Sequence, residues 1–202
     1  MKFLLPVLVL TSILLASDVL KAFGYAWTVS SASDWKVEQD NGTLVLHLLR
    51  ARGPLPGPRR PIQFALAQTP ELKSVTLDVD AQPLEKSLIL VFAYRDAAHF
   101  DYAHLSTDRA TVEPHHNGIF HVYGGERVRI SAEEGPAAFA ATKRWYHVRL
   151  TYDGQSGSVQ VAVDGQPIPA LHAIDLSLHG GRIGLGSFDE TADFKNVKIT
   201  SP

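Results

Sequence analysis

Short runs of valine, isoleucine, leucine, phenylalanine and tyrosine recur along the chain from Trp27 onward, each bounded by glycine, proline, aspartate or asparagine. No segment in this part keeps its apolar residues at the 3.6-residue spacing of an amphipathic helix. Runs of this kind between turn residues are typical of an all-β fold, and their number predicts a two-sheet antiparallel β-sandwich. The strands are predicted at Trp35–Glu38, Leu44–Leu49, Ile62–Phe64, Ser74–Val79, Ser87–Tyr94, Phe100–Ser106, Gly118–Tyr123, Arg127–Ser131, Trp145–Tyr152, Ser158–Val163, Gly181–Ser187 and Phe194–Thr200.

Turn residues mark several strand ends. Asp40-Asn41-Gly42 and Asp164-Gly165 are hairpin signals. Asp153-Gly154-Gln155-Ser156-Gly157 is a longer polar loop, which predicts a hairpin from Tyr146 to Val163. Residues 51–61 (ARGPLPGPRRP) are predicted to be a loop that crosses an edge of a sheet, because proline cannot donate a hydrogen bond to a ladder. Residues 131–143 are predicted to be a loop with at most one helical turn, because Gly135 and Pro136 interrupt their helical propensity.

Composition narrows the class of protein. With 202 residues and 45% apolar content, the chain can bury a core and is long enough for one sandwich domain. There is no cysteine, so no disulfide holds the fold. The net charge of -2 gives no electrostatic footprint for phosphates, so nucleic acid is not expected as a partner.

The N-terminal residues resemble an export signal. Lys2 precedes fourteen mostly apolar residues, Phe3 to Ala16, a stretch too short to cross a bilayer comfortably as a helix. We predict a helical signal peptide over residues 1–24 and a mature domain over residues 25–202. Several small residues near this boundary offer a cleavage site. Ala22-Phe23-Gly24 has the usual small-x-small form. The protein is therefore expected to be secreted, periplasmic or at the cell surface, without stable membrane insertion after cleavage. An uncleaved anchor is the alternative.

Four stretches together resemble a known family. The closing stretch holds glycines that permit close backbone approach, and the hairpin before it carries a W-x-x-V pattern and an Asp-Gly turn. The stretches are SLILVFAYRDAAHFDYAHLS (Ser87–Ser106), HNGIFHVYGGERVRIS (His116–Ser131), RWYHVRLTYDGQSGSVQVAVDG (Arg144–Gly165) and GRIGLGSFDETADFKNVKI (Gly181–Ile199). They resemble the concanavalin A-like, or laminin G-like, jelly roll of bacterial exported proteins. The likeness is to the 3-keto-disaccharide hydrolase and family-16 glycoside hydrolase-like group.

The resemblance implies a link to glycans but does not supply a catalytic pair. Retaining family-16 hydrolases carry an E-x-D-x-x-E pattern, and this chain has none. The family also implies a structural calcium bound by a carboxylate on the last strand, which corresponds to Asp193. A solvated turn carboxylate is the alternative for that residue.

Five of the nine histidines (His99, His104, His115, His116 and His121) fall within 23 residues, among tyrosines and arginines. Period-two counting predicts that Tyr102 and His104 share one strand face, and that the next strands add polar and aromatic side chains to that open, concave face. Such a groove suits a sugar, which stacks on rings and takes hydrogen bonds. The predicted ligand-binding residues are Tyr102, His104, Asn117, His121, Tyr123, Arg127 and Arg129. A solvated face without a ligand, or a transition-metal site built on the histidines, are the alternatives.

Three functions remain open: a secreted carbohydrate-binding domain, a glycoside-degrading enzyme of the 3-keto-disaccharide hydrolase type, and a structural or adhesive domain. A pocket with a carboxylate of perturbed pKa within hydrogen-bond reach of His104 or His121 would favour the enzyme.

Overall fold

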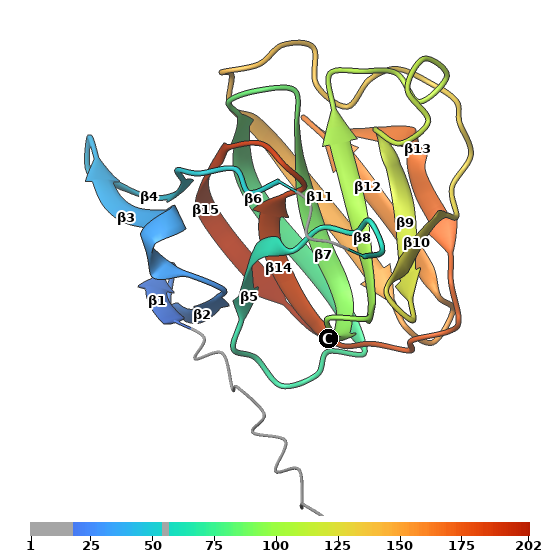
Figure 1. Cartoon of the computed structure of the whole chain (residues 1–202), viewed down its shortest axis with the longest axis horizontal. Coiled ribbons are helices and arrows are strands. Elements are labelled where there is room, and N and C mark those ends of the chain that lie inside the picture. Colours follow the sequence, from blue (N-terminus) through green and yellow to red (C-terminus); the bar gives the residue numbers. More distant parts are fainter. Residues whose placement is uncertain (1–17, 54–56) are drawn as a thin grey trace, which may run out of the picture.

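The computed structural model describes residues 18–53 and 57–202, and these residues form two antiparallel sheets packed face to face (Figure 1). The predicted all-β sandwich is therefore confirmed, and one short 3-10 turn, Ala32–Asp34, is the helical element in the described part of the chain. The eight-stranded sheet has the order β1 (Asp18–Ala22), β2 (Tyr25–Val29), β5 (Gln63–Ala67), β14 (Arg182–Ser187), β7 (Ser87–Asp96), β8 (His99–Ser106), β9 (Gly118–Tyr123) and β10 (Glu126–Arg129). The seven-stranded sheet has the order β13 (Gln166–Ile174), β12 (Ser158–Val163), β11 (Tyr146–Asp153), β6 (Ser74–Pro83), β15 (Ala192–Thr200), β4 (Thr43–Leu48) and β3 (Trp35–Asp40).

Every strand predicted from the sequence overlaps an observed one, and the β11–β12 hairpin closes as expected. The Asp164-Gly165 pair has positive φ at both residues, as a type I′ turn requires, and joins β12 to β13. Residues 49–62, in their described parts, carry the chain from β4 in one sheet to β5 in the other, which is the predicted crossing. Residues 131–143 are a loop.

Three strands were not predicted. β13 contains Pro167 and Pro169, whose missing N–H groups are tolerated because β13 is the edge strand of its sheet. β1 and β2 form a hairpin at the edge of the other sheet, turning at Phe23 and Gly24, both with positive φ. The sequence that we read as a cleavage signal, Ala22-Phe23-Gly24, thus forms the end of a strand and its turn.

The predicted start of the domain at residue 25 lies within this hairpin. The indole Nε1 of Trp27 donates to the Ala22 carbonyl at 3.0 Å, which ties β1 to the core. The predicted signal helix lies, over residues 1–17, outside the described residues. Within them, no helix has the length and apolar character needed to traverse a membrane.

The main core lies between the sheets. Trp27, Leu46, Phe92 and Phe194 are among its fully buried side chains. A Cβ on Gly186 in β14 would collide with the backbone of the neighbouring strand β5, so the glycine permits the close approach of the two strands.

Candidate functional site

The eight-stranded sheet is apolar on both faces. In β7, Leu88, Leu90 and Phe92 point into the main core, whereas Ile89 and Val91 belong to a second cluster on the opposite, outer face. This outer cluster consists of Leu66, Ile89, Val91, Phe100, Tyr102, Phe120, Val122 and Phe188, with Phe64 and Tyr94 packed against it. A sheet that is covered on both sides explains why β7 is a continuous apolar run rather than an alternating one.

The segment that crosses between the sheets helps to cover the outer face. Arg60 donates from Nε to the Ala97 carbonyl at 2.8 Å, and Arg59 places its guanidinium 5.2 Å from the centre of the Phe188 ring. The crossing segment therefore contributes side chains to this face, which the proline-rich sequence alone did not indicate.

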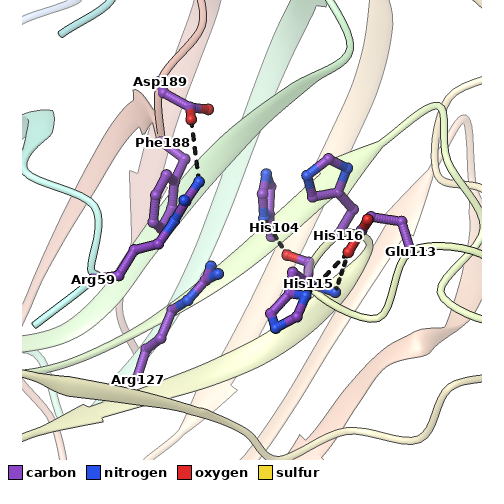
Figure 2. Close-up of a pocket in the computed structure, with 8 residues that line it drawn as sticks. All are labelled: Arg59, His104, Glu113, His115, His116, Arg127, Phe188 and Asp189. Atoms are coloured by element: carbon purple, nitrogen blue, oxygen red, sulfur yellow. Dashed lines mark hydrogen bonds and ion pairs between the residues drawn. The ribbon is translucent and has the colours of Figure 1, made fainter. Parts of the chain in front are cut away.

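A pocket of about 310 Å³ opens on this face, and we call it the outer-face pocket (Figure 2). Its side chains come from the crossing segment, from β8 and the loop after it, from β10 and from the turn after β14. The lining residues are Arg59, His104, Glu113, His115, His116, Arg127, Phe188 and Asp189.

His104 forms part of the pocket floor as a neutral imidazole. Burial lowers the pKa of His104 to about 3. Its Nδ1 lies 3.0 Å from the His115 carbonyl, which can only accept, so Nδ1 carries the hydrogen. Nε2 then accepts from the Ser87 hydroxyl at 2.9 Å. With both nitrogens occupied, His104 is positioned to shape the pocket and not to exchange protons with a ligand.

Two arginines and one aromatic ring form the opposite wall. The Arg127 guanidinium carbon lies 4.6 Å from the centre of the Phe188 ring, and Arg59 lies over the same ring. Arg59 also forms an ion pair with the exposed Asp189 at 3.4 Å. Figure 2 shows the two guanidinium groups on one side of the pocket and the histidines with Glu113 on the other. The wall thus offers fixed planar donors to a ligand.

The carboxylates of the pocket are already paired. Glu113 accepts from the backbone N–H of His115 at 3.2 Å, and its pKa is lowered by this bond and by the His115 side chain. Nearby, the Glu190 carboxylate accepts from the Ser87 backbone N–H, and burial raises its pKa. No carboxylate among the described residues lies within hydrogen-bond reach of His104.

Six of the seven predicted ligand-binding residues lie on strands of the eight-stranded sheet, and they divide between its two faces. Tyr102 and His104 do share the outer face, and Arg127 and Arg129 join them, since their guanidinium groups lie over the Phe120 ring. The alternation predicted for β9 is wrong, however: Phe120 and Val122 face outward, so His121 and Tyr123 point the other way. The error came from assuming that only one face of this sheet is apolar.

The residues on the outer face differ in their exposure to a ligand. Tyr102 is fully buried, so its ring cannot stack on a sugar without rearrangement, and its pKa is raised to about 12 by burial. Of the seven, His104 and Arg127 line the pocket.

Asn117 and Arg129 hold loops together. Asn117 is fully buried, donating to the Pro136 carbonyl at 3.1 Å and accepting from the Ala138 N–H at 3.0 Å. Arg129 donates to five backbone carbonyls, at 2.7–3.3 Å, in the loops on either side of β9 and β10. These polar residues look like ligand contacts in the sequence, but their hydrogen bonds go to the chain itself.

A carboxylate of perturbed pKa beside His104 or His121 would favour an enzyme. His121 has such a partner, but the pair lies outside the outer-face pocket. The His121 Nδ1 donates to Asp101 at 2.6 Å, and burial raises the pKa of Asp101 to about 6. The pair faces the seven-stranded sheet and does not line the outer-face pocket.

Asp193, the residue expected to bind calcium, contacts a histidine. Its Oδ1 lies 2.8 Å from Nδ1 of His47, and burial raises the pKa of Asp193. Calcium favours shells of oxygen ligands, whereas the partner of Asp193 Oδ1 is an imidazole nitrogen. A calcium ion there stays a prediction.

Arg59, Glu113, Phe188 and Asp189 line the pocket and were not predicted. Phe188-Asp189 follows the glycine-rich strand β14, and Arg59 lies in the crossing segment, so neither belongs to the histidine cluster that drew attention in the sequence. The density of arginine in a proline-rich crossing is a signal that could have found Arg59.

Comparisons with known proteins identify the fold. No protein-family model and no curated protein sequence matches the chain. Among solved structures, the carbohydrate-binding module CBM66 from Bacillus subtilis matches with a TM-score of 0.61 at 18% identity, over 87% of this chain and 95% of the module.

Two larger proteins match over part of their length. A mutant of a GH43 protein from Bacillus licheniformis has a TM-score of 0.56 at 14% identity, over 87% of this chain and 37% of that protein. A xylan beta-1,4-xylosidase from Bacillus halodurans has a TM-score of 0.53 at 16% identity, over 85% of this chain and 35% of that protein. The chain therefore shares its two-sheet β-sandwich fold with these three proteins.

Proposed function

We propose that the protein is a secreted carbohydrate-binding domain that holds a glycan in the outer-face pocket. The observation that carries this proposal is the wall formed by Arg59, Arg127 and Phe188 beside a neutral His104, on a fold that spans nearly all of the CBM66 module. CBM66 is a carbohydrate-binding module, which supports carbohydrate as the ligand class.

The pocket chemistry suits hydroxyl-rich ligands. A guanidinium group donates two parallel hydrogen bonds, which fits two neighbouring sugar hydroxyls, and the carboxylates of Glu113 and Asp189 can accept from others. A volume of about 310 Å³ is at the small end for ligand sites, so we expect about one or two sugar rings to be held. Because Tyr102 is buried, recognition relies on hydrogen bonds more than on the ring stacking that the sequence suggested.

The contacts favour binding over hydrolysis. A hydrolase needs a proton donor and a base or nucleophile at the bond to be cleaved. His104 has both nitrogens engaged, Glu113 is bonded to His115, and Asp189 is paired with Arg59. An enzyme of the 3-keto-disaccharide hydrolase type and a structural or adhesive domain are the alternatives that the experiment distinguishes.

The experiment compares glycan binding by three proteins: the chain from Asp18 onward, its Arg127→Ala variant and its Arg149→Ala variant. Arg149 is a matched control because it is half-exposed on the other sheet, where it is paired with Asp78. We expect a glycan array to identify a ligand that the Arg149 variant binds like the parent and that the Arg127 variant binds at least about tenfold more weakly.

Absence of any bound glycan would support the structural or adhesive alternative. Equal binding by all three proteins would place the site elsewhere. Release of sugar from 3-keto-glycosides by the parent, measured by chromatography, would favour the enzyme.

Export is the second part of the proposal. Because β1 is paired with β2, a signal peptidase that cut after Gly24 would remove an edge strand of the sheet, so we expect the cut before Asp18, near Ala16 or Ser17. Mass spectrometry of the protein collected from the medium or periplasm measures its N-terminus. An N-terminus at Tyr25, or retention in the cytoplasm, would contradict this part of the proposal.

A further inference from the structure

A second cluster of ionisable groups lies at the end of β13, facing away from the outer-face pocket. Asp101 and His121 are directly paired residues of β8 and β9, and Asp175 follows the last residue of β13 in the other sheet. One ligand atom from each residue lies within 4.8 Å of the others. The three side chains therefore bring the two sheets together at one point.

This cluster has more hydrogen-bond acceptors than hydrogens to donate. Nδ1 of His121 lies 2.6 Å from Asp101 Oδ1 and 2.8 Å from Asp175 Oδ2, yet one ring nitrogen carries at most one hydrogen. That hydrogen goes to Asp101, and Asp175 Oδ2 is left buried without a hydrogen bond from any described residue. Oxygens of two carboxylates thus converge on one ring nitrogen, and the single hydrogen of that nitrogen satisfies one of them.

Asp101 supplies an independent sign that the cluster can hold a cation. The residue is fully buried, and its second oxygen, Oδ2, has no hydrogen-bond partner among the described residues. An unpaired buried carboxylate oxygen is costly, and native proteins compensate such groups with hydrogen bonds, opposite charge or a metal ion. The Tyr152 hydroxyl is also buried without a hydrogen-bond partner among the described residues, and its pKa is raised to about 12 by burial first and then by the charges of Asp101 and Asp175.

We propose that Asp101, His121 and Asp175 bind one divalent transition-metal ion of the zinc type. Two carboxylates and one imidazole are hard and borderline donors that suit zinc, manganese or cobalt, whereas calcium prefers oxygen ligands alone. The ion takes the place of the hydrogen on His121 Nδ1 and neutralises the two carboxylate charges. Because the ligands come from both sheets, the bound ion clamps the sandwich at this end.

The test uses protein stripped of metal with a chelator and then titrated with zinc chloride by calorimetry, with cobalt chloride as a spectroscopic probe of the ligand set. The variants are Asp175→Asn and His121→Gln. Asp193→Asn is the matched control, since Asp193 is also a buried carboxylate bonded to a histidine Nδ1 but has no third ligand among the described residues. His116→Gln controls for zinc at surface histidines, because His116 contacts Asp108 and lies near His104.

We expect one zinc ion per chain, a tenfold or greater loss of affinity in the Asp175 and His121 variants, and unchanged affinity in both controls. We also expect zinc at about a hundredfold excess over Kd to raise the Tm of the parent by about 5 °C or more and to leave the Asp175 variant unchanged. Without metal, the Asp175 variant should unfold at or above the parent Tm, because it lacks one of two facing carboxylates.

The proposal is overturned if the parent binds no zinc, or if only the His116 variant loses it. It is also overturned if the Asp175 and His121 variants, shown to be folded by circular dichroism, bind zinc as the parent does. If the parent binds no zinc, a proton shared among the three side chains holds the cluster together instead.

Discussion

The guanidinium carbon of Arg127 lies 4.6 Å from the centre of the Phe188 ring, although Arg127 belongs to β10 and Phe188 to the turn after β14. The Phe188 ring is nearly buried, and the Arg127 guanidinium group packs over its face. A cation over an aromatic face is stabilised by about 0.5–2 kcal/mol, which is enough to fix one orientation of the guanidinium group. The ring on this wall therefore positions a donor for the proposed sugar.

Replacement of Phe188 tests this arrangement. Phe188→Leu removes the ring but keeps an apolar side chain, so we expect glycan affinity to fall about three- to tenfold with a smaller change in stability. Phe64→Leu is the control, because Phe64 packs against the same outer cluster and does not line the pocket. Calorimetry with the glycan found on the array measures both. Equal affinities of the two variants would show that Phe188 does not orient Arg127.

Variants of Tyr102 distinguish a packing role of this residue from a role in ligand binding. Its hydroxyl accepts from Arg127 at 3.3 Å, and its ring stacks on Phe120 with centres 5.2 Å apart. We expect Tyr102→Phe to lose about 1 kcal/mol or less of unfolding free energy, and Tyr102→Ala to lose about 3–5 kcal/mol because it leaves a cavity. Urea unfolding measures both losses. If Tyr102→Ala abolished glycan binding without loss of stability, the ring would contact the ligand directly.

The lowered pKa of His104 predicts that the protein loses stability as the pH falls. The pKa of His104 is lowered by burial to about 3, whereas a histidine in an unfolded chain titrates near 6.5. The unfolded chain therefore takes up the proton first, so the stability that depends on neutral His104 is complete above about pH 6.5 and is lost as the pH falls toward 3.

The measurement is the free energy of unfolding of the parent and of His104→Gln, in urea at pH 7 and pH 4.5. We expect the parent to lose on the order of 2 kcal/mol more than the variant over this interval. Nitrogen NMR of the ring should show hydrogen on Nδ1 at both pH values. Equal losses in the two proteins, or a charged ring at pH 4.5, would contradict the neutral assignment.

Asn117 is expected to act on stability and not through ligand contact. Asn117→Ala removes a donor to Pro136 and an acceptor from Ala138, and it places alanine at a φ of 49°, so we expect a loss of about 2–4 kcal/mol. Asn41→Ala is the control, since Asn41 has a φ of 48° in an exposed turn. The difference between the two losses, measured by urea unfolding, isolates the buried hydrogen bonds. Similar losses would mean that backbone strain alone accounts for the effect.

The sequence predicted the strands well where one face is buried and the other is solvated. The β11–β12 hairpin alternates cleanly, with Tyr146, Val148, Leu150 and Tyr152 buried and the residues between them mostly exposed. In β9 both faces are covered, so alternation of polar and apolar residues did not indicate which face meets the core. The face of His121 was therefore assigned wrongly.

The candidate site was harder to predict because it depends on contacts between distant segments. Arg59, Arg127 and Asp189 meet only when the crossing segment, β10 and the turn after β14 are folded together, and no local pattern links them. Conversely, Asn117 and Arg129 have the side chains of a binding site but use them on nearby carbonyls, which the sequence does not distinguish from ligand contacts.

Pro167 and Pro169 give the outermost strand of the seven-stranded sheet two positions that lack a backbone donor. An exposed sheet edge is a template on which a strand from another molecule can add, and missing donors interrupt that ladder. The two prolines therefore disfavour the joining of copies of the protein into a continuous intermolecular sheet at this edge, even at high local concentration.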